Sequence, residues 1–281
     1  MRKVVLITGC SSGIGRATAL RFAEEGWCVY ASARRLDSLR ELAAPGLVPL
    51  ALDVDDDASR REAVSRVLSE AGRLDALVNN AGYGLMGPLA ALMPERLREQ
   101  METNVIAPME LARLALTAPG GMLERRSGRV VNVGSVVSYA PTPFSGAYCA
   151  SKAALRALSD VLRLELLPFG IQVVQVEPGP IRSGFAAAAR TAAHRTLGEL
   201  GPYDYLRPYV EKRIGASQRH AAPAEDAAAA IYRAAAAARP PAHITVTGQA
   251  RGMKAVKALL PDRATDAVLA RAFGLDRPAP R

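Results

Sequence analysis

The chain has no long apolar run. Near the N-terminus, only the four apolar residues Val4 to Ile7 come before Thr8 and Gly9. A membrane-spanning helix needs about 18 or more apolar residues, and the core of a signal peptide is also longer than this run. We therefore expect no integral membrane segment and a cytoplasmic location.

Cysteine and histidine are scarce. The three cysteines, Cys10, Cys28 and Cys149, are odd in number and lack C-x-x-C spacing, which argues against a disulfide framework and against a zinc site. Unpaired thiols fit a reducing compartment. The three histidines are scattered, without the spacing of metal ligands, so we expect no metal.

Aromatic and acidic residues are also few. Aromatics make up 5% of the chain, and 36 Lys and Arg against 27 Asp and Glu give a net charge of +9. A basic charge of this size is one signature of nucleic-acid binding. The basic residues are spread along the whole chain with few aromatics beside them, however. We interpret them as a solvated surface and expect no nucleic-acid partner.

The sequence does contain a regular alternation of strand and helix patterns. Short apolar runs bounded by turn residues predict strands at 3–8, 28–32, 47–52, 74–78, 129–133, 171–176 and 243–247. Longer amphipathic or alanine-rich segments predict helices at 16–23, 58–70, 95–114, 147–167, 225–238 and 251–273. This order predicts an α/β fold: a doubly wound, Rossmann-like parallel sheet with right-handed crossovers and helices on both faces.

Neither a linker nor an internal repeat divides the chain. We expect one domain over residues 1–275 and a frayed tail at 276–281. The segment 181–220 is expected to be irregular and to form a lid whose closure excludes water from the substrate. The arginines of this segment are Arg190, Arg195, Arg207 and Arg213. We expect them to be solvated charges on the surface, and the alternative is that they bind an anionic tail of the substrate.

Glycines follow the first predicted strand in the pattern G-x-x-x-G-x-G, formed by Gly9, Gly13 and Gly15. Glycine lets the backbone approach a phosphate closely, and the N–H groups at the start of a helix attract anions. The same glycines could make a simple turn. The strand before them and the helix after them favour a diphosphate site.

The second predicted strand is followed by Arg34 and Arg35 instead of an acidic residue. An acid at this point binds the ribose 2′-hydroxyl of NAD, whereas an arginine accommodates the 2′-phosphate of NADP. Arg16 at the start of the first helix adds a further positive charge. These residues favour NADP(H), although two exposed arginines in a loop are the alternative.

Tyr148 and Lys152 are four residues apart at the start of a predicted helix, and Ser135 comes 13 residues before the tyrosine, at the end of a strand. Side chains at this spacing lie on one face of a helix. An ammonium about 4–5 Å away is expected to lower the phenol pKa from ~10 by roughly 2–3 pH units, into the range of acid-base catalysis. Tyr-x-x-x-Lys pairs also arise by chance on surface helices.

Taken together, these motifs resemble the short-chain dehydrogenase/reductase family over roughly residues 3 to 250. The motifs, in chain order, are Thr8-Gly9-x-x-x-Gly13-x-Gly15, Asn79-Asn80-Ala81-Gly82, Asn104, Ser135, Tyr148-x-x-x-Lys152 and Pro178-Gly179. Within the family, the chain looks like the branch of hydroxysteroid and retinol dehydrogenases and acyl-dihydroxyacetone-phosphate reductases.

The resemblance implies a role for each of four catalytic residues. Tyr148 would exchange a proton with the substrate oxygen. Lys152 would lower the tyrosine pKa and hold the nicotinamide ribose. Ser135 would hydrogen-bond the carbonyl oxygen as charge develops, and Asn104 would anchor a water that links Lys152 to solvent.

The resemblance also implies a cofactor site and the state of assembly. Besides Tyr148 and Lys152, the implied NADP(H)-binding residues are Gly9, Ser11, Ser12, Gly13, Ile14 and Gly15 at the diphosphate, Arg34 at the 2′-phosphate, Asp53 and Val54 at the adenine, Asn80, Ala81 and Gly82 at the ribose, and Pro178, Gly179, Ile181 and Ser183 at the nicotinamide. Ser183 stands where the family more often has threonine. A homodimer or a homotetramer is allowed, although Pro119-Gly120-Gly121 is unusual near the family's interface helix.

The implied reaction is hydride transfer between nicotinamide and a secondary alcohol, ketone or aldehyde of a hydrophobic substrate such as a steroid, a retinoid or a long-chain acyl ketone. The residues expected to bind it are Ser135, Tyr148, Leu85, Met86, Val137, Phe144 and Phe185. The apolar ones could equally be core. A non-catalytic NADP-binding regulatory protein, and an epimerase or dehydratase that retains its cofactor, remain as alternatives.

Overall fold

The computed structural model describes residues 2–198, 200–215 and 221–279. Its centre is a seven-stranded sheet in the order β3-β2-β1-β4-β5-β6-β7, with every neighbouring pair parallel. The strands are β1 (Val4–Ile7), β2 (Cys28–Ala33), β3 (Leu47–Ala51), β4 (Ala76–Asn79), β5 (Gly128–Val133), β6 (Ile171–Glu177) and β7 (His243–Thr245). The predicted doubly wound, Rossmann-like single domain is confirmed. The exact boundary at residue 275 stays a prediction.

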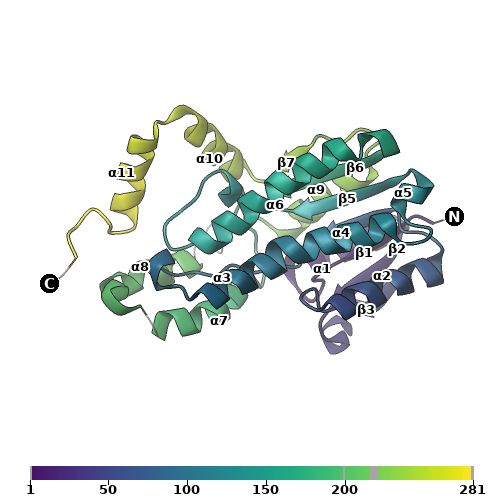
Figure 1. Cartoon of the computed structure of the whole chain (residues 1–281), viewed down its shortest axis with the longest axis horizontal. Coiled ribbons are helices and arrows are strands. Elements are labelled where there is room, and N and C mark those ends of the chain that lie inside the picture. Colours follow the sequence, from purple (N-terminus) through teal and green to yellow (C-terminus); the bar gives the residue numbers. More distant parts are fainter. Residues whose placement is uncertain (1, 199, 216–220, 280–281) are drawn as a thin grey trace.

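Helices cover both faces of the sheet (Figure 1). One face carries α1 (Gly13–Glu24) and α9 (Ala224–Ala236), which pack against each other. The other face carries α2 (Asp57–Ala71), α4 (Ala107–Thr117) and α6 (Gly146–Glu165). Between α4 and β5 lies the short α5 (Met122–Arg125). Such a sheet is buried on both sides, which explains why its strands read as continuous apolar runs.

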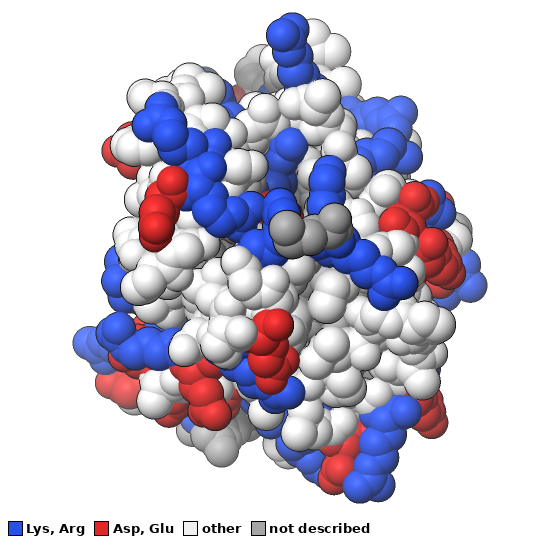
Figure 2. All heavy atoms as spheres, turned by 90° about the vertical axis from the view of Figure 1, so that its right-hand side faces the viewer, with Lys and Arg blue, Asp and Glu red and all other residues white. Residues whose placement is uncertain are grey.

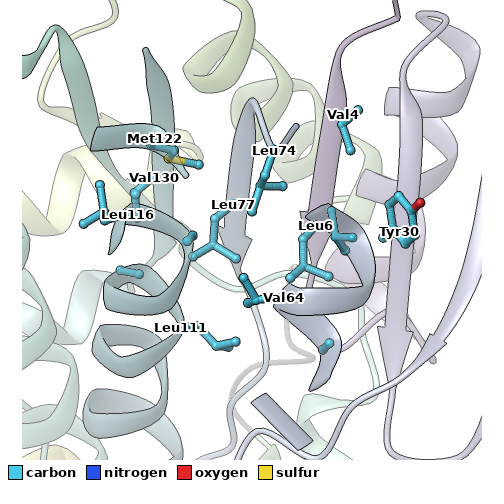
Figure 3. Packing of buried hydrophobic residues seen from close by; sticks show 14 of the residues in the cluster. Val4, Leu6, Tyr30, Val64, Leu74, Leu77, Leu111, Leu116, Met122 and Val130 are labelled. Atoms are coloured by element: carbon cyan, nitrogen blue, oxygen red, sulfur yellow. The ribbon is translucent and has the colours of Figure 1, made fainter. Parts of the chain in front are cut away.

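The alternation of side chains along each strand divides the core in two. Val4 and Leu6 of β1 point into a cluster beneath α2 and α4, while Val5 and Ile7 point into the cluster beneath α1 and α9. Figure 3 shows the first cluster, where Leu6 and Leu77 face Val64 and Leu111 from the helices. These two cores hold the strand ends, and so the loops after them, in fixed positions.

The helix predicted at 95–114 is interrupted. It consists of α3 (Pro94–Met101), the π-helical turn η3 (Glu102–Ile106) and α4. Pro108 has no N–H to donate to the carbonyl of Asn104, four residues earlier, and its ring crowds that carbonyl. The widened turn therefore occurs at Asn104, one of the predicted catalytic residues, and π-turns are frequent at functional sites.

The prediction of an irregular segment at 181–220 is wrong for most of its described part. Residues Phe185–Gly198 form α7, Gly201–Leu206 form the 3₁₀ helix η6, and Arg207–Gly215 form α8. Alanine favours helix, and Ala189 and Ala193 of α7 are fully buried in a third apolar cluster. Residues 199 and 216–220 of this segment lie outside the described residues.

The C-terminal helix predicted at 251–273 is two helices, α10 (Gly248–Leu259) and α11 (Asp262–Ala272). Pro261 separates them because it cannot continue a helix. In Figure 1, α7, α8, α10 and α11 all lie toward the end of the molecule opposite the N-terminus. Residues 276–279 have no helix or strand, and 280–281 lie outside the described residues, so the frayed tail stays a prediction. The remaining short 3₁₀ helices are η1 (Leu36–Leu39), η2 (Leu89–Ala91), η4 (Val136–Ser138) and η5 (Leu167–Phe169).

Basic side chains gather in the upper half of the face at the N-terminal end of the molecule (Figure 2). Near the amino ends of the strands, Arg73 and Arg125 both pair with Asp75, with Arg125 Nη2 2.8 Å from its carboxylate. Part of the positive charge is therefore balanced within the chain. Among the described residues, no helix is long and apolar enough to cross a membrane.

Candidate active site

The glycine loop between β1 and α1 is a narrow backbone cradle. Gly9 and Gly13 have φ angles of +73° and +54°, which favour glycine. A Cβ on Gly13 would lie 2.5 Å from Cβ of Ser183, and one on Gly9 would lie 2.9 Å from Cα of Ala81. Three loops that are distant in sequence therefore meet here, and any side chain would fill the space between them.

The start of α1 suits a diphosphate. Its first turn contains no acidic residue, and its N-cap, Ser12, makes no side-chain capping bond. The helix amides are thus oriented for an anion, as the positive end of a helix dipole favours. Thr8 locks the loop to the one after β4, because its Oγ1 accepts hydrogen bonds from the N–H groups of Asn80 (3.0 Å) and Ala81 (2.9 Å). The sequence motif contained Thr8, but its structural role was not predicted.

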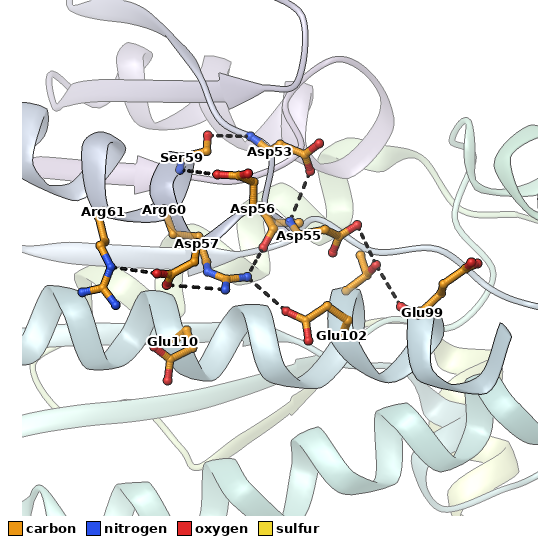
Figure 4. A network of polar contacts seen from close by, with 12 residues as sticks. Asp53, Asp55, Asp56, Asp57, Ser59, Arg60, Arg61, Glu99, Glu102 and Glu110 are labelled. Atoms are coloured by element: carbon orange, nitrogen blue, oxygen red, sulfur yellow. Dashed lines mark hydrogen bonds and ion pairs between the residues drawn. The ribbon is translucent and has the colours of Figure 1, made fainter. Parts of the chain in front are cut away.

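The adenine end of the predicted cofactor site is fixed by a polar network (Figure 4). The buried Arg60 of α2 donates from Nη1 to the carbonyl of Val54 (2.6 Å) and to Glu102 (3.2 Å). Thr103 donates to Asp55 at 3.0 Å. The loop after β3 is therefore tied to the π-turn that carries Asn104. The side chain of Val54 packs in the core, so only its backbone is placed to face a cofactor.

Arg34 follows β2 and is exposed, beside the loop that carries Asp55. Burial raises the pKa of Asp55, and the positive charge of Arg34 is among the influences that lower it. Arg16, the other predicted cationic contact, lies 3.5 Å from Glu41 and is paired with it. Arg34 is thus the better placed of the two for a phosphate on the ribose.

Tyr148 and Lys152 extend from the first turns of α6, beside Ser135 at the end of β5. Tyr148 is buried, with 7% of its surface exposed. Burial raises the pKa of Tyr148 and outweighs two influences that lower it, a hydrogen bond with Ser135 and the positive charge of Arg213. The predicted net lowering of this pKa is therefore wrong, since loss of hydration is the larger effect.

Lys152 is directed at the backbone. Its Nζ donates to the carbonyl of Val133 at 2.8 Å, and burial lowers its pKa from 10.5 to about 8. A cation that titrates near neutral pH is a weaker source of positive charge than the predicted fixed ammonium. It is also close to Gly82, where an added Cβ would lie 3.7 Å from Nζ.

Asn104 joins the loop after β4 to helix α6. Its Nδ2 donates to the carbonyl of Tyr83 (3.0 Å) and to the hydroxyl of Ser151 (3.0 Å), which neighbours Lys152 on α6. Its Oδ1 accepts from the Tyr83 N–H at 3.2 Å. Gln100, a residue that sequence reasoning missed, supports the same loop by accepting from the Leu85 N–H at 2.7 Å. No pattern in the sequence distinguished Gln100, because its full burial is seen only in the structure.

Most of the predicted substrate wall gathers around the tyrosine. The ring of Phe185 lies 5.3 Å from that of Tyr148, centroid to centroid. Met86, Val137 and Phe144 belong to the same apolar cluster. Leu85 does not, because it packs with Leu92 and Ala147 in a separate cluster.

The strand end of β6 completes the site. The carbonyl of Pro178 accepts from the Val136 N–H at 3.2 Å, which holds the turn of 178–183 beside Ser135. Ile181 is buried and pairs with Ala222 in a short parallel bridge. Gly179 faces Ala250 of α10: a Cβ added to Gly179 would lie 3.2 Å from the Cβ of Ala250. The predicted nicotinamide turn therefore borders both the catalytic strand and the C-terminal helices.

The arginines of the lid segment differ from one another. Arg190 is exposed, and Arg207 pairs with Asp204. Arg213 was expected to be solvated, but it is half-buried: its Nε donates to Thr142 (3.1 Å) and Ser145 (3.2 Å) just before α6. The prediction failed because spacing along the chain did not show which face of α8 packs inward. The side chain of Arg195 lies outside the description.

The family model for short chain dehydrogenase matches residues 3–194. The chain belongs to this family. It is 31% identical over 272 residues to the NADPH-dependent 3-dehydrocapnine reductase of Ornithobacterium rhinotracheale, covering 95% of each chain. It is 39% identical over 220 residues to human 17-beta-hydroxysteroid dehydrogenase type 1, covering 74% of this chain and 66% of the human protein. The predicted family and its hydroxysteroid branch are thus confirmed.

Solved structures of family members have the same architecture. A short-chain dehydrogenase from Streptomyces avermitilis is 32% identical, with 98% of both chains covered and a TM-score of 0.76. One from Burkholderia cenocepacia, solved with NADP, is 25% identical over 95% of this chain and 97% of its own, with a TM-score of 0.70. One from Burkholderia phymatum, solved with NAD, is 25% identical over 100% and 97%, with a TM-score of 0.78. Family members therefore share a nicotinamide cofactor but differ in its 2′-group.

Proposed function

We propose that this oxidoreductase transfers a hydride between NADP(H) and a secondary alcohol, ketone or aldehyde of a hydrophobic substrate, with Tyr148 as the general acid and base. The observation that carries the proposal is the meeting of three features in one place. The buried Tyr148 lies beside Ser135, and Lys152 follows it one turn along α6. Gly13 of the glycine cradle lies against Ser183, two residues before Phe185, whose ring packs on Tyr148.

In the direction of carbonyl reduction, Tyr148 gives its proton to the substrate oxygen while Ser135 donates a hydrogen bond to that oxygen. When bound, the nicotinamide supplies the hydride, and Lys152 holds the adjoining ribose. Asn104 keeps the Tyr83 loop and α6 at a fixed separation through its contacts with Tyr83 and Ser151. Ordered donors around the oxygen stabilise its developing charge without reorganisation.

The choice of NADP(H) over NAD(H) rests on Arg34. It follows β2 without an acidic residue in its place, and a guanidinium binds a phosphate strongly and with defined geometry. Two relatives support this choice: the NADPH-dependent 3-dehydrocapnine reductase, and the Burkholderia cenocepacia enzyme solved with NADP. The neighbour with NAD bound shows why Arg34 must be tested directly.

The substrate is proposed to be apolar beside its reacting carbon. Met86, Val137, Phe144 and Phe185 surround Tyr148 with hydrocarbon, as in most small-molecule sites. The hydroxysteroid and 3-dehydrocapnine enzymes among the relatives support a steroid or a long-chain ketone as the first compounds to try. A cytoplasmic location and assembly as a homodimer or homotetramer belong to the same proposal.

The test is a turnover screen. Purified protein is mixed with NADPH and a panel of steroid, retinoid and long-chain acyl ketones, and the loss of NADPH absorbance is followed. Tyr148→Phe should lower kcat at least about a hundred-fold while NADPH binding stays normal, because general acid catalysis contributes about 10²–10⁴-fold. Tyr232→Phe, on the far side of the sheet against Glu25, is the matched control and should keep full activity.

Other outcomes would replace the proposal. Tight NADPH binding without oxidation by any compound of the panel would indicate a regulatory protein. Substrate conversion at constant NADPH absorbance would indicate an epimerase or a dehydratase that retains its cofactor.

A further inference from the structure

Arg213 brings a positive charge from the lid helix α8 to the first turn of α6. Its Nε donates to the hydroxyls of Thr142 (3.1 Å) and Ser145 (3.2 Å). Ser145 is the N-cap of α6, and its hydroxyl lies 3.5 Å from the sulfur of Cys149. Tyr148 is the residue next to that cysteine, three positions after Ser145. The guanidinium therefore sits at the helix turn that carries the proposed catalytic phenol.

This is an unfavourable place for a cation. The N-terminus of a helix already carries a partial positive charge, which attracts anions and repels arginine. The first turn of α6 contains no acidic residue, and within the described part of the chain no Asp or Glu pairs with Arg213. Burial lowers the pKa of Arg213, opposed by the negative charges that Cys149 and Tyr148 acquire when ionised. An ionised Tyr148 would relieve this concentration of positive charge.

The lid is seated at the same point. Val210 and Ile214, on either side of Arg213 in α8, are buried in the apolar cluster that contains Tyr148 and Cys149. The C-terminal end of the chain supports this arrangement from outside, since the ring of Phe273 lies 5.8 Å from that of Phe144. The position of the guanidinium thus depends on α8 being packed against α6.

We propose that Arg213 is a positioning residue that docks the lid helix on the start of α6 and supplies the second positive charge that stabilises the Tyr148 phenolate. The first such charge is expected from Lys152, one turn further along α6, although its Nζ donates to the Val133 carbonyl. An open lid would remove one of these two charges, so the tyrosine becomes fully competent only when the lid is closed over the substrate. The inference rests on the proposed role of Tyr148.

Other ionisable groups near the tyrosine must be considered in any test. Within the described residues, those in or beside the cluster include Cys149 and Lys152 on α6, Arg213 and Tyr209 on α8, Tyr203 on η6 and Tyr139 after η4. The neutral contact from α7 is Phe185. Besides Lys152 and Arg213, the cations beside the cluster are Arg156 and Lys254, which lie 5.6 and 5.5 Å from the ring centroid of Tyr139. Arg213 differs from these two because it binds Thr142 and Ser145 at the start of α6, so Arg213→Met removes the cation from that turn.

The experiment measures the ionisation of Tyr148 directly. The near-ultraviolet absorbance of tyrosinate is followed against pH, and the curve of the matching Tyr148→Phe protein is subtracted to leave the signal of this residue. The proteins compared are wild type, Arg213→Met, Arg213→Lys and Arg207→Met, the last being a lid arginine paired with Asp204. No substrate and no turnover are needed.

We expect Arg213→Met to raise the pKa of Tyr148 by about 1 unit, since a nearby opposite charge lowers that of an acid by about 1–3 units. Arg213→Lys should restore most of the difference, and Arg207→Met should leave the curve unchanged. Once a substrate is known, the pH profile of kcat/KM should move in the same direction. If Arg213→Met does not fold, the lysine variant and Ser145→Ala, which keeps the charge but removes one anchor, still test the inference through smaller shifts.

An unchanged tyrosine titration in Arg213→Met would overturn the inference. Should that variant also show a raised KM confined to substrates with a carboxylate or phosphate, Arg213 would instead be an anion-binding residue. A shifted titration in a protein without turnover would uphold the role of Arg213 and reject only the proposed oxidoreductase activity.

Discussion

The ammonium of Lys152 donates a hydrogen bond to the carbonyl oxygen of Val133, at a distance of 2.8 Å. In this position it is buried, and burial lowers its pKa from 10.5 to about 8. The charge of Lys152, which follows the proposed catalytic tyrosine on α6, is therefore expected to depend on pH. This relationship leads to the first prediction.

Wild-type stability should rise with pH relative to Lys152→Met. The unfolded chain keeps the lysine proton up to a pKa near ~10.4, whereas the folded protein releases it near 8, so between these values the unfolded state binds more protons and raising the pH favours folding. We expect the difference in unfolding free energy between the two proteins to change by about 2–3 kcal/mol from about pH 7.5 to about pH 10.5. Urea denaturation across this range is the measurement. The exposed Lys212→Met should show no such pH trend, and a flat difference for Lys152→Met would contradict the buried ammonium.

Gly13→Ala should impair cofactor binding. An alanine would have to adopt φ +54°, and its Cβ would lie 2.5 Å from that of Ser183. The loop is therefore expected to relax to another conformation, and restoring the left-handed one on binding costs about 1–2 kcal/mol, so the Kd for NADPH should rise about ten-fold. Fluorescence titration with NADPH measures this. Gly252→Ala in α10, where an added Cβ meets nothing within 4 Å, should leave the Kd unchanged and stabilise the protein by about 0.5–1 kcal/mol.

Arg34→Asp should reverse the preference between the two nicotinamide cofactors. The substitution removes a charge-assisted bond to the 2′-phosphate, worth about 1.5–3 kcal/mol, and adds repulsion. The ratio of NADPH to NADH affinity should fall by at least about ten-fold. The neighbouring exposed Arg35→Asp serves as the control for net charge. Equal losses in both variants would mean that Arg34 makes no specific contact.

Arg60→Met should destabilise the protein where Arg61→Met does not. Arg60 is buried and binds the Val54 carbonyl and Glu102, whereas Arg61 makes an exposed pair with Asp57 (Figure 4). Loss of the buried contacts should cost about 1–3 kcal/mol, and loss of the exposed pair less than about 1 kcal/mol. Chemical denaturation compares the two. Equal effects would show that the tie between the β3 loop and the π-turn contributes no stability.

The sequence alone determined the order of the seven strands, most of the helices between them and the glycine cradle. The resemblance of its motifs to the family indicated the four residues proposed for catalysis. These are local patterns: apolar runs, glycine spacing and the four-residue interval from Tyr148 to Lys152 each act within a few residues of chain. The helices at Phe185–Gly198 and Arg207–Gly215 were missed because arginine, proline and tyrosine hid a stripe of buried alanines. The buried face of this segment shows only in the structure, where Ala189 and Ala193 pack into the apolar cluster.

Tertiary structure decided the electrostatics. That Lys152 turns toward Val133, that Arg213 comes within hydrogen-bonding distance of Ser145, and that burial raises the pKa of Tyr148 all depend on elements far apart in the chain. Hydration and charge depend on what lies nearby in space, and the sequence does not state these distances. The sequence identified the groups that we propose to react, and the fold determined the surroundings that set the charge of each.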